Sequence, residues 1–345
     1  MAASFDFIKR LGSGYFGVVW KVRDTGLNAI RALKLIPPDK VLDPNNFSLE
    51  AQTLQAVKHS NVVEVLETGH MHDGRVYVAM EYLEKGSLED EASGAFVKLT
   101  RAKRVMVDVL RGLEHAHFSS IVHRDIKPGN IMIGDSSEGK LSDFGLALPV
   151  NVSPLSLGVK AYNYLMHLAP EVRRSGIYTE RADLYACGVT LYRLVNGDKY
   201  LPFVPVPKLS ALVAAGKFPD RSKYREFVPR SLRIVINKAM NVDPNNRFVN
   251  AREMRHALEQ VAINMNWDER VLPDGMQWIS GWNERCYEVV RRQIGTNRWS
   301  VTVRKGRSKR TLRINNQLSL VADTKAAAEK RSSRVLQDFV LGRQT

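Results

Sequence analysis

The amino-acid sequence predicts an α+β fold, with a large N-terminal part and a small, basic α+β domain at the C-terminal end. One observation is a glycine-rich segment followed directly by a strand, a turn and a second strand, which favours a β-rich lobe near the N-terminus. The other is a change of composition near residue 265. Residues 265–345 hold 16 Lys or Arg and 8 Asp or Glu, and so carry +8 of the net charge of +15.

The glycine-rich segment "LGSGYFGVVWKV" places Gly12, Gly14 and Gly17 in a G-x-G-x-x-G spacing. A dinucleotide-binding fold needs a strand before such glycines and a helix after them, and we predict neither here. Instead "VVWKVRD" reads as a strand, residues 25–28 as a turn and residues 29–36 as the next strand. A Walker-type loop is excluded because Gly-Lys-Ser/Thr is missing. The remaining possibility is a glycine-rich hairpin over phosphates, with Lys34 on the following strand.

Further motifs follow Lys34 in a fixed order along the chain. A helix-like segment carries Glu50, and "VYVAMEYLEKGSL" predicts a strand that runs into a hinge. Each motif alone is weak evidence, since short motifs recur by chance. The later motifs are "IVHRDIKPGNIM" at 121–132, "LSDFGLA" at 141–147, "LAPE" at 168–171, "ADLYACGVTLYRLVNG" with Asp183, and "DPNNRF" with Arg247.

In this order and spacing, the motifs resemble the eukaryotic-type serine/threonine protein kinase family over about residues 5–264. The resemblance implies a bilobal protein-kinase fold in residues 1–264, with a small β-rich N-lobe and a helical C-lobe. It also implies a magnesium-dependent enzyme that transfers the γ-phosphate of ATP to Ser or Thr of protein substrates, and that autophosphorylates. Within the family, Lys127 indicates serine/threonine rather than tyrosine kinases.

The resemblance assigns a role to each matching residue. Phosphoryl transfer mainly requires positioning and charge neutralisation, so Lys34, held by Glu50, is expected on the ATP phosphates. Asp143 and Asn130 offer the oxygen ligands that Mg²⁺ prefers. Asp125 is the expected proton acceptor, and Lys127 the group that stabilises the transferring phosphoryl. The expected ATP-binding residues are Leu11, Gly12, Ser13, Gly14, Tyr15, Phe16, Gly17, Val19, Ala32, Lys34, Met80, Glu81, Leu83 and Asp143. Asp183 and Arg247 are expected to be buried structural anchors, with Arg247 paired to Glu171.

The segment before Ala-Pro-Glu departs from the family pattern. Gly158 is followed by Val159, and the segment contains no threonine, although the family usually has a Gly-Thr pair there. Our hypothesis is that Ser153 or Ser156 is autophosphorylated and that Arg124 binds the phosphorylated loop. The alternative is a loop that is ordered without phosphorylation.

The C-terminal region predicts a tryptophan-rich connector at 265–285 and a small basic domain at 286–345. Strands are expected at 286–292, 299–305 and 311–314, and a helix at about 324–341. Residues 290–313 hold nine Lys or Arg. These cations indicate either a surface for nucleic acid or an acidic partner or a solvated strand face, and we favour the second interpretation.

The bulk composition limits the remaining alternatives. No apolar run reaches the length of a membrane helix, and the N-terminus lacks a secretory signal pattern. Two cysteines form no disulfide framework, so the cytoplasm is the expected compartment. Two other functions stay open: a non-catalytic kinase-like scaffold, and a protein whose basic tail is the functional centre with the kinase as its regulator.

Overall fold

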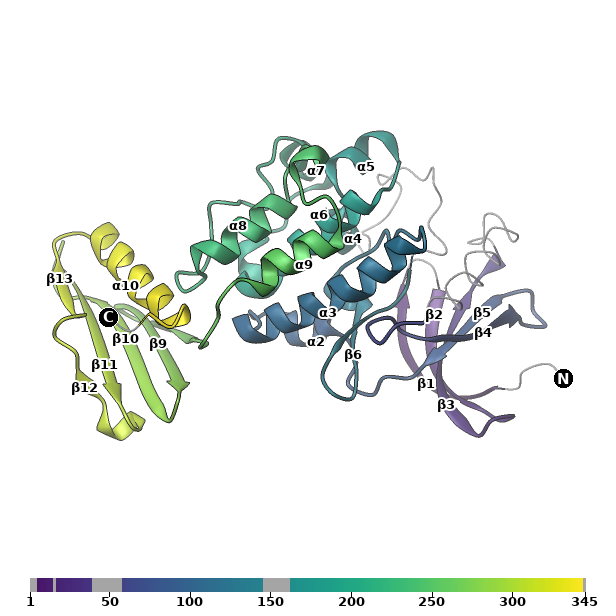
Figure 1. The fold of residues 1–345 in the computed structure, drawn as a ribbon, viewed down its shortest axis with the longest axis horizontal. Coiled ribbons are helices and arrows are strands. Elements are labelled where there is room, and N and C mark those ends of the chain that lie inside the picture. The colour runs from purple at the N-terminus through teal and green to yellow at the C-terminus, as the bar shows by residue number, and fades with distance from the viewer. Residues whose placement is uncertain (1–4, 15–16, 39–57, 145–161, 344–345) are drawn as a thin grey trace.

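The structure is a computed structural model that describes residues 5–14, 17–38, 58–144 and 162–343. Figure 1 shows a twisted sheet at one end, a group of helices in the middle and a second sheet with one helix at the other end. The β-rich lobe, the helical lobe and the basic C-terminal domain follow the order of the chain. Within the described residues, no helix is both long and apolar enough to cross a membrane.

The N-terminal lobe is a five-stranded antiparallel sheet in the order β1-β2-β3-β5-β4. The strands expected on either side of the turn at 25–28 are confirmed as β2 and β3. The expectation that no strand precedes the glycines is wrong, because β1 runs up to Gly14 and pairs with β2. Its bounds and those of the other strands are β1 (Phe5–Gly14), β2 (Gly17–Asp24), β3 (Ala29–Ile36), β4 (Val65–His70) and β5 (Val76–Glu81).

Strand β3 places Lys34 on the face of the sheet that looks toward the helical lobe. Successive side chains of a strand point to opposite faces. Leu33 and Leu35 are buried in a small cluster on one face, whereas Ala32 and Ile36 join the main core on the other. Lys34 shares its face with Ala32 and Ile36, so the alternating pattern of β3 directs its ammonium group between the lobes.

The second lobe is helical and surrounds the long helices α3 and α6. Helix α6 is almost entirely buried, and α3 packs against both α6 and α9. A short hairpin of β6 (Ile131–Ile133) and β7 (Gly139–Leu141) lies against α3 and frames the segment that contains Asp143. The helices are α2 (Leu88–Ala92), α3 (Leu99–Phe118), α4 (Tyr162–His167), α5 (Pro170–Ser175), α6 (Glu180–Asn196), α7 (Val206–Ala214), α8 (Arg230–Ala239) and α9 (Ala251–Glu259).

The C-terminal region forms an antiparallel sheet in the order β12-β11-β10-β9-β8, with β13 paired to β11 and one helix on the sheet. The expected helix is confirmed as α10, capped by Thr324, whose Oγ1 accepts a hydrogen bond from Ala327 N at 3.2 Å. The bounds are β8 (Asp268–Leu272), β9 (Gly275–Trp282), β10 (Arg285–Gln293), β11 (Trp299–Gly306), β12 (Arg313–Ile314), β13 (Leu320–Ala322) and α10 (Lys325–Val340).

Residues 265–285, expected to be a connector, supply two strands of this sheet. The turn residues of the segment close hairpins, since Asn283 and Glu284 both adopt positive φ between β9 and β10. Trp278 is fully buried, and its Nε1 donates to Glu269 Oε2 at 3.0 Å. The expected limits of the connector and the domain, at residues 264 and 285, remain a prediction.

The C-terminal domain contacts the helical lobe through Glu226. The carboxylate of Glu226 accepts hydrogen bonds from Arg291 Nη1 at 2.6 and 2.7 Å and from Ser332 Oγ at 2.6 Å. The indole Nε1 of Trp267, just before β8, donates to Leu336 O in α10 at 3.2 Å. Strand β10 and helix α10 are therefore joined to the helical lobe by a charge-assisted pair.

Candidate functional site

A pocket lies between the β-sheet lobe and the helical lobe. It contains three residues that the sequence predicts for ATP binding: Lys34, Met80 and Asp143. Lys34 Nζ lies 2.8 Å from Asp143 Oδ1, so the two lobes meet in an ion pair. Five further lining residues were not predicted from the sequence, namely Val63, Val65, Val78, Ser142 and Phe144.

Asp143 is held in an uncommon backbone conformation with φ of +56°. A left-handed conformation is unfavourable for most residues other than glycine, and it persists only where the surroundings impose it. The preceding Ser142 N donates to Asn130 O at 2.9 Å, and the following Phe144 packs on His123, with ring centroids 4.4 Å apart. Burial raises the pKa of the Asp143 carboxyl, but Lys34 and then Lys127 outweigh burial and hold it below its usual range.

Asp125, Lys127 and Asn130 form a second group of polar contacts in the helical lobe. Lys127 Nζ lies 2.9 and 2.7 Å from the two carboxylate oxygens of Asp125. Asn130 Nδ2 donates to Asp125 Oδ2 at 2.7 Å and to its main-chain oxygen at 2.8 Å. The expected proton acceptor is thus fixed in position by the two expected neighbours of the same loop.

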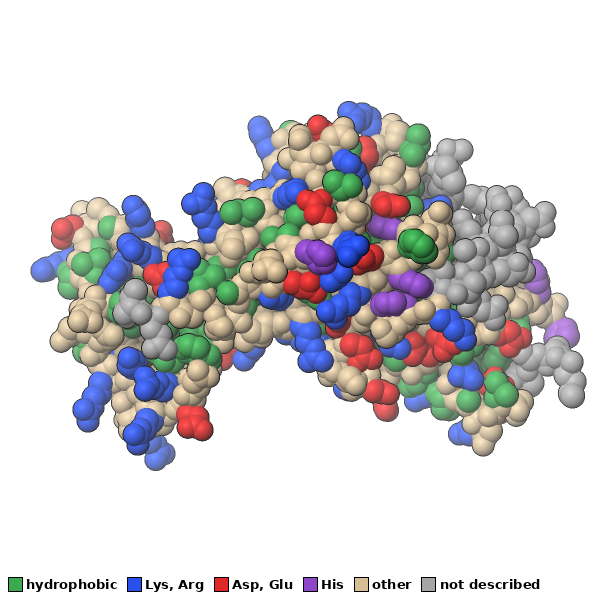
Figure 2. All heavy atoms as spheres, viewed as in Figure 1, with side chains coloured by type: hydrophobic (Ala, Val, Ile, Leu, Met, Phe, Trp, Pro, Cys, Tyr) green, Lys and Arg blue, Asp and Glu red, His purple; other side chains and the backbone are tan. Residues whose placement is uncertain are grey.

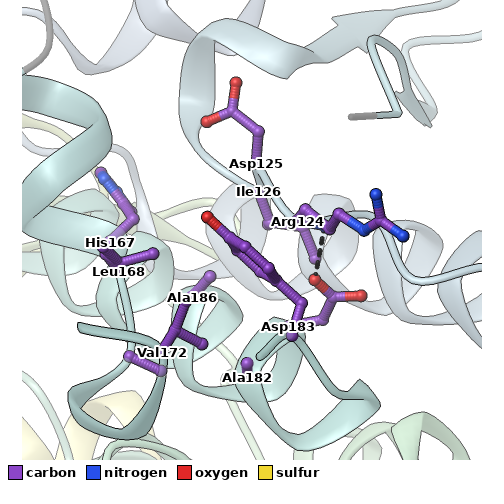
Figure 3. Close-up of a pocket in the computed structure, with 11 residues that line it drawn as sticks. Arg124, Asp125, Ile126, His167, Leu168, Val172, Ala182, Asp183 and Ala186 are labelled. Atoms are coloured by element: carbon purple, nitrogen blue, oxygen red, sulfur yellow. Dashed lines mark hydrogen bonds between the residues drawn. The ribbon is translucent and has the colours of Figure 1, made fainter. Parts of the chain in front are cut away.

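Asp183 anchors the loop that carries Asp125, as the sequence predicts. The side chain is 1% exposed and accepts hydrogen bonds from His123 N at 2.7 Å and Arg124 N at 2.9 Å. A third contact, 2.9 Å long, joins it to His117 Nε2. Arg124 has a positive φ of 70°, and the hydrogen bond drawn in Figure 3 holds that backbone in place. His123 is deeply buried, which lowers the pKa of its imidazole, and its Nε2 lies 3.0 Å from Ser142 O.

A hollow beside Asp125 was not predicted from the sequence. In Figure 3 the Asp125 carboxylate points outward at its edge, while His167, Leu168 and Val172 lie on one side and Asp183 on another. His167 and Leu168 directly precede the Ala-Pro-Glu motif. That position next to a predicted motif is the only sequence signal that pointed to them.

The Ala-Pro-Glu motif is tied to the helical lobe by the pair that the sequence predicts. Arg247 Nη1 and Nη2 lie 2.7 Å from the two carboxylate oxygens of Glu171. The Arg247 side chain is fully buried and that of Glu171 is 14% exposed. Such a bidentate pair fixes the orientation of both side chains, which confirms the expected anchoring role of Arg247.

Two glycines of the glycine-rich segment have different surroundings. At Gly17 φ is +149°, and a Cβ would collide with the main-chain oxygen of Leu35, so the hairpin itself requires glycine there. At Gly12 a Cβ would meet nothing within 4 Å. No described residue therefore fills the space beside Gly12, which leaves room for a group outside the chain. Leu11 and Ser13 are exposed next to it, Gly14 ends β1, and the predicted residues Tyr15, Phe16 and Glu50 lie outside the described residues.

The expected adenine contacts lie along β2, β3 and the end of β5. Val19 is opposite Lys34, and Ala32 is opposite Met80 in the strand register. The main-chain N–H of Glu81 already donates to Glu64 O at 3.1 Å. The expected adenine contact of Glu81 can therefore be made only by its main-chain carbonyl oxygen. Its carboxylate pairs with Lys140 Nζ at 2.8 Å. Leu83 O accepts a hydrogen bond from Gly86 N at 3.3 Å.

The residues present fit a magnesium ion bound together with phosphate. Asn130 Nδ2 donates to Asp125, so in the described part of the chain the amide oxygen of Asn130 is left for a metal. Among the described residues, Asp143 Oδ2 makes no hydrogen bond, because Lys34 contacts only Oδ1. The described part of the chain contains no group of three or more His, Cys, Asp or Glu suited to a metal. Two oxygen ligands suit Mg²⁺, which takes its other ligands from phosphate and water.

Comparison with known proteins agrees with this geometry. Residues 5–259 match the sequence profile described as the protein kinase domain. The chain is 32% identical over 266 residues to serine/threonine-protein kinase PknJ of Mycobacterium tuberculosis, covering 74% of this chain and 45% of that protein. It is 29% identical over 264 residues to serine/threonine-protein kinase PrkC of Bacillus subtilis, covering 74% and 40%. The chain thus spans less than half of the length of these curated relatives.

Proposed function

This chain belongs to the protein kinase family, and from that premise we propose that it transfers the γ-phosphate of ATP to serine or threonine hydroxyls of protein substrates. The proposal rests on two observations: the Lys34–Asp143 ion pair in the pocket between the lobes, and the Asp125–Lys127–Asn130 group on the helical lobe. A cation, two metal-ligand oxygens and a carboxylate are the parts that phosphoryl transfer requires. The names of the relatives support serine and threonine as acceptors.

On the nucleotide side, Lys34 binds the phosphates, and the open space beside Gly12 lets the main chain approach them. Met80, Glu81 and Leu83 face the adenine, with Leu11, Val19 and Ala32 on either side of it. Asp143 and Asn130 hold Mg²⁺, which when bound neutralises charge on the phosphate oxygens. The Lys34–Asp143 contact of 2.8 Å keeps both charged groups in the cleft.

On the substrate side, the Asp125 carboxylate accepts the proton of the attacking hydroxyl. Its two contacts with Lys127 and its contact with Asn130 restrict its orientation. Positioning of this kind supplies much of the rate enhancement in phosphoryl transfer. Lys127, which lies against the same carboxylate, would also stabilise negative charge on the transferring phosphoryl group.

Autophosphorylation is part of the proposal. Ser153 and Ser156 lie outside the described residues, and Arg124, next to Asp125, is the cation expected to bind a phosphoserine there. Mass mapping of the active protein should find phosphate on the peptide that contains them. If the protein is fully active and that peptide is unmodified, the result would favour the alternative, a loop that is ordered without phosphorylation.

The decisive test is incubation of the full chain with labelled ATP, Mg²⁺ and a generic protein substrate, beside Asp143→Ala. We expect labelled phosphoserine or phosphothreonine with the parent chain and none above background with the variant. Equal labelling in both proteins would contradict the catalytic assignment and favour a kinase-like scaffold.

The described cysteines Cys187 and Cys286 are free and buried, which supports the cytoplasm as the proposed compartment.

A further inference from the structure

Six cations of the C-terminal domain gather at one end of its sheet. Lys305 lies opposite Tyr287 on one side and opposite Arg313 on the other. Arg285 begins β10, and the remaining cations occupy the short loop and turn between β11 and β12. Figure 2 shows several Lys and Arg side chains at this lower end of the domain. We call this group the basic end; it consists of Arg285, Lys305, Arg307, Lys309, Arg310 and Arg313.

The cations of the basic end do not stabilise the described part of the chain through ion pairs. All six side chains are exposed, and none of them makes an ion pair with a described residue. Other arginines of the same domain are paired: Arg291 with Glu226 at 2.6 Å and Arg304 with Glu288 at 2.6 Å. Close like charges repel each other, so a cluster that stabilises nothing internally points to an anion outside the chain.

The local acid content is too low to neutralise the cluster. Glu284, in the turn before β10, is the one carboxylate within residues 281–287, and residues 304–314 contain none. The positive potential of the basic end therefore extends into the solvent, where it attracts polyanions.

In place of the solvated strand face favoured from the sequence, we propose that the basic end binds the sugar–phosphate backbone of a nucleic acid, without reading its base sequence. Four of the six cations are arginine, whose planar guanidinium pairs with phosphate through two hydrogen bonds. A nucleic acid presents a phosphate at every nucleotide, which suits six cations accompanied by a single carboxylate. A lipid surface fits less well. Ile314, which is 55% exposed beside Arg313, offers only one apolar side chain for insertion into a bilayer.

This binding must depend strongly on salt. Each phosphate contact releases counterions, so six contacts give a slope of about −5 in a plot of log affinity against log salt concentration. Affinity for duplex DNA should then fall roughly a thousandfold between 50 and 200 mM salt. The inference is independent of the proposed phosphoryl transfer, since it involves other residues and no ATP.

The experiment measures fluorescence anisotropy of a labelled 20-base-pair mixed-sequence DNA duplex, and of an RNA duplex of the same sequence, with the full chain from 50 to 200 mM KCl. The test variant is Arg307→Gln/Lys309→Gln/Arg310→Gln. The control, Lys199→Gln/Lys208→Gln/Lys217→Gln, removes the same charge from exposed lysines of the helical lobe. We expect the test variant to lose at least 30-fold in affinity at 100 mM and about three units of salt slope, with the control within threefold of the parent.

Several outcomes would overturn the inference. Equal losses in both triple variants would assign binding to net charge alone, and no anisotropy change at 50 mM would exclude nucleic acid. Tighter binding to phosphatidylserine vesicles, or to a poly-glutamate peptide, than to either duplex would assign the basic end to a membrane or to an acidic protein. If the test variant unfolds in a thermal melt, Arg285→Gln/Lys305→Gln/Arg313→Gln takes its place with the same expectation.

Discussion

The catalytic cleft and the basic end use the same kinds of charged side chain in opposite ways. In the cleft, Lys34 contacts Asp143 at 2.8 Å and Lys127 contacts Asp125 at 2.7 Å. At the basic end, Arg307 and Arg310 are exposed and make no ion pair with a described residue. A paired cation fixes the position of the carboxylate that it contacts, whereas an unpaired cluster creates a field that acts on molecules outside the chain.

The energetic consequence of this difference is that paired and unpaired cations respond differently to substitution. Removal of one partner from a buried pair leaves an uncompensated charge in a poorly solvated site. Removal of an exposed, unpaired cation leaves no uncompensated charge in the protein, so the free energy of unfolding hardly changes. The two regions are thus distinguished by which measurement a substitution affects: catalysis and stability in one, binding of polyanions in the other.

The largest effect is expected from Asp125→Asn in the cleft. The amide cannot accept the hydroxyl proton, so the phosphorylation rate should fall by about 10²–10⁴-fold, while DNA affinity stays unchanged. Steady-state assays of kcat with saturating ATP measure the loss. Asp135→Asn, an exposed aspartate after β6, is the matched control and should keep full activity. A rate within threefold of the parent for Asp125→Asn would refute its assigned role.

The next effect compares a buried cation with an exposed one. Arg247→Met removes the bidentate contacts to Glu171 and leaves that carboxylate unpaired, so the free energy of unfolding should fall by about 3–5 kcal/mol. Arg310→Met at the basic end should change it by less than about 0.5 kcal/mol. Urea unfolding followed by circular dichroism measures both. Similar losses in the two variants would abolish the distinction between buried, paired cations and exposed, unpaired ones.

A smaller effect is expected where the C-terminal domain meets the helical lobe. Glu226→Gln keeps an oxygen for Ser332 but removes the charge that faces Arg291, whose side chain is 6% exposed. Hydrogen bonds to charged groups contribute about 1.5–3 kcal/mol, so we expect a loss of about 2 kcal/mol. Faster limited proteolysis between α9 and β8 should accompany it. Unchanged unfolding and unchanged proteolysis would mean that this pair does not hold the domain in place.

Sequence reasoning located the cleft residues because short motifs fix local backbone geometry. Lys34, Asp125 and Asp143 lie in motifs whose order and spacing predicted them, whereas the face of β3 that carries Lys34 was evident only from the structure. Val63 and Val78, which line the pocket, were not predicted. They come to line it only because segments that are distant in the sequence lie together in the fold. No local pattern distinguishes them from other core residues.

Strands at both ends of the chain were not predicted, for a related reason. Strand β1 contains Gly12 and Gly14, which are unfavourable in strands, so its extent and its pairing with β2 were not evident from propensity. The tryptophans of residues 265–285 indicated packing but not strand formation, since the register of β8 and β9 depends on β10. The contact of Glu226 with Arg291 joins segments 65 residues apart, beyond the range of any local pattern.

The smallest expected effect is a pH dependence of stability that does not extend to the basic end. Burial, and then the charges of His115 and Arg111, lower the pKa of the His59 imidazole, against the opposing effect of Glu114. The unfolded chain therefore binds more protons at this position than the folded chain does, and His59 contributes a loss of stability as the pH falls from 7.5 to 5.5. His59 is partly exposed, so its share stays well below the ceiling of about 1.4 kcal/mol per pH unit for one proton.

His59→Asn tests this dependence, because asparagine keeps an acceptor for Asn61 N, which donates to His59 Nδ1 at 3.0 Å. Urea midpoints at pH 7.5, 6.5 and 5.5 should decline less steeply in the variant than in the parent chain. Arginine and lysine do not titrate in this interval, so DNA affinity at constant salt should change less than threefold. If the urea midpoint declines with pH as steeply in the variant as in the parent, His59 does not cause the pH dependence. A DNA affinity that varied tenfold over this interval would show that a titrating group contributes to binding at the basic end.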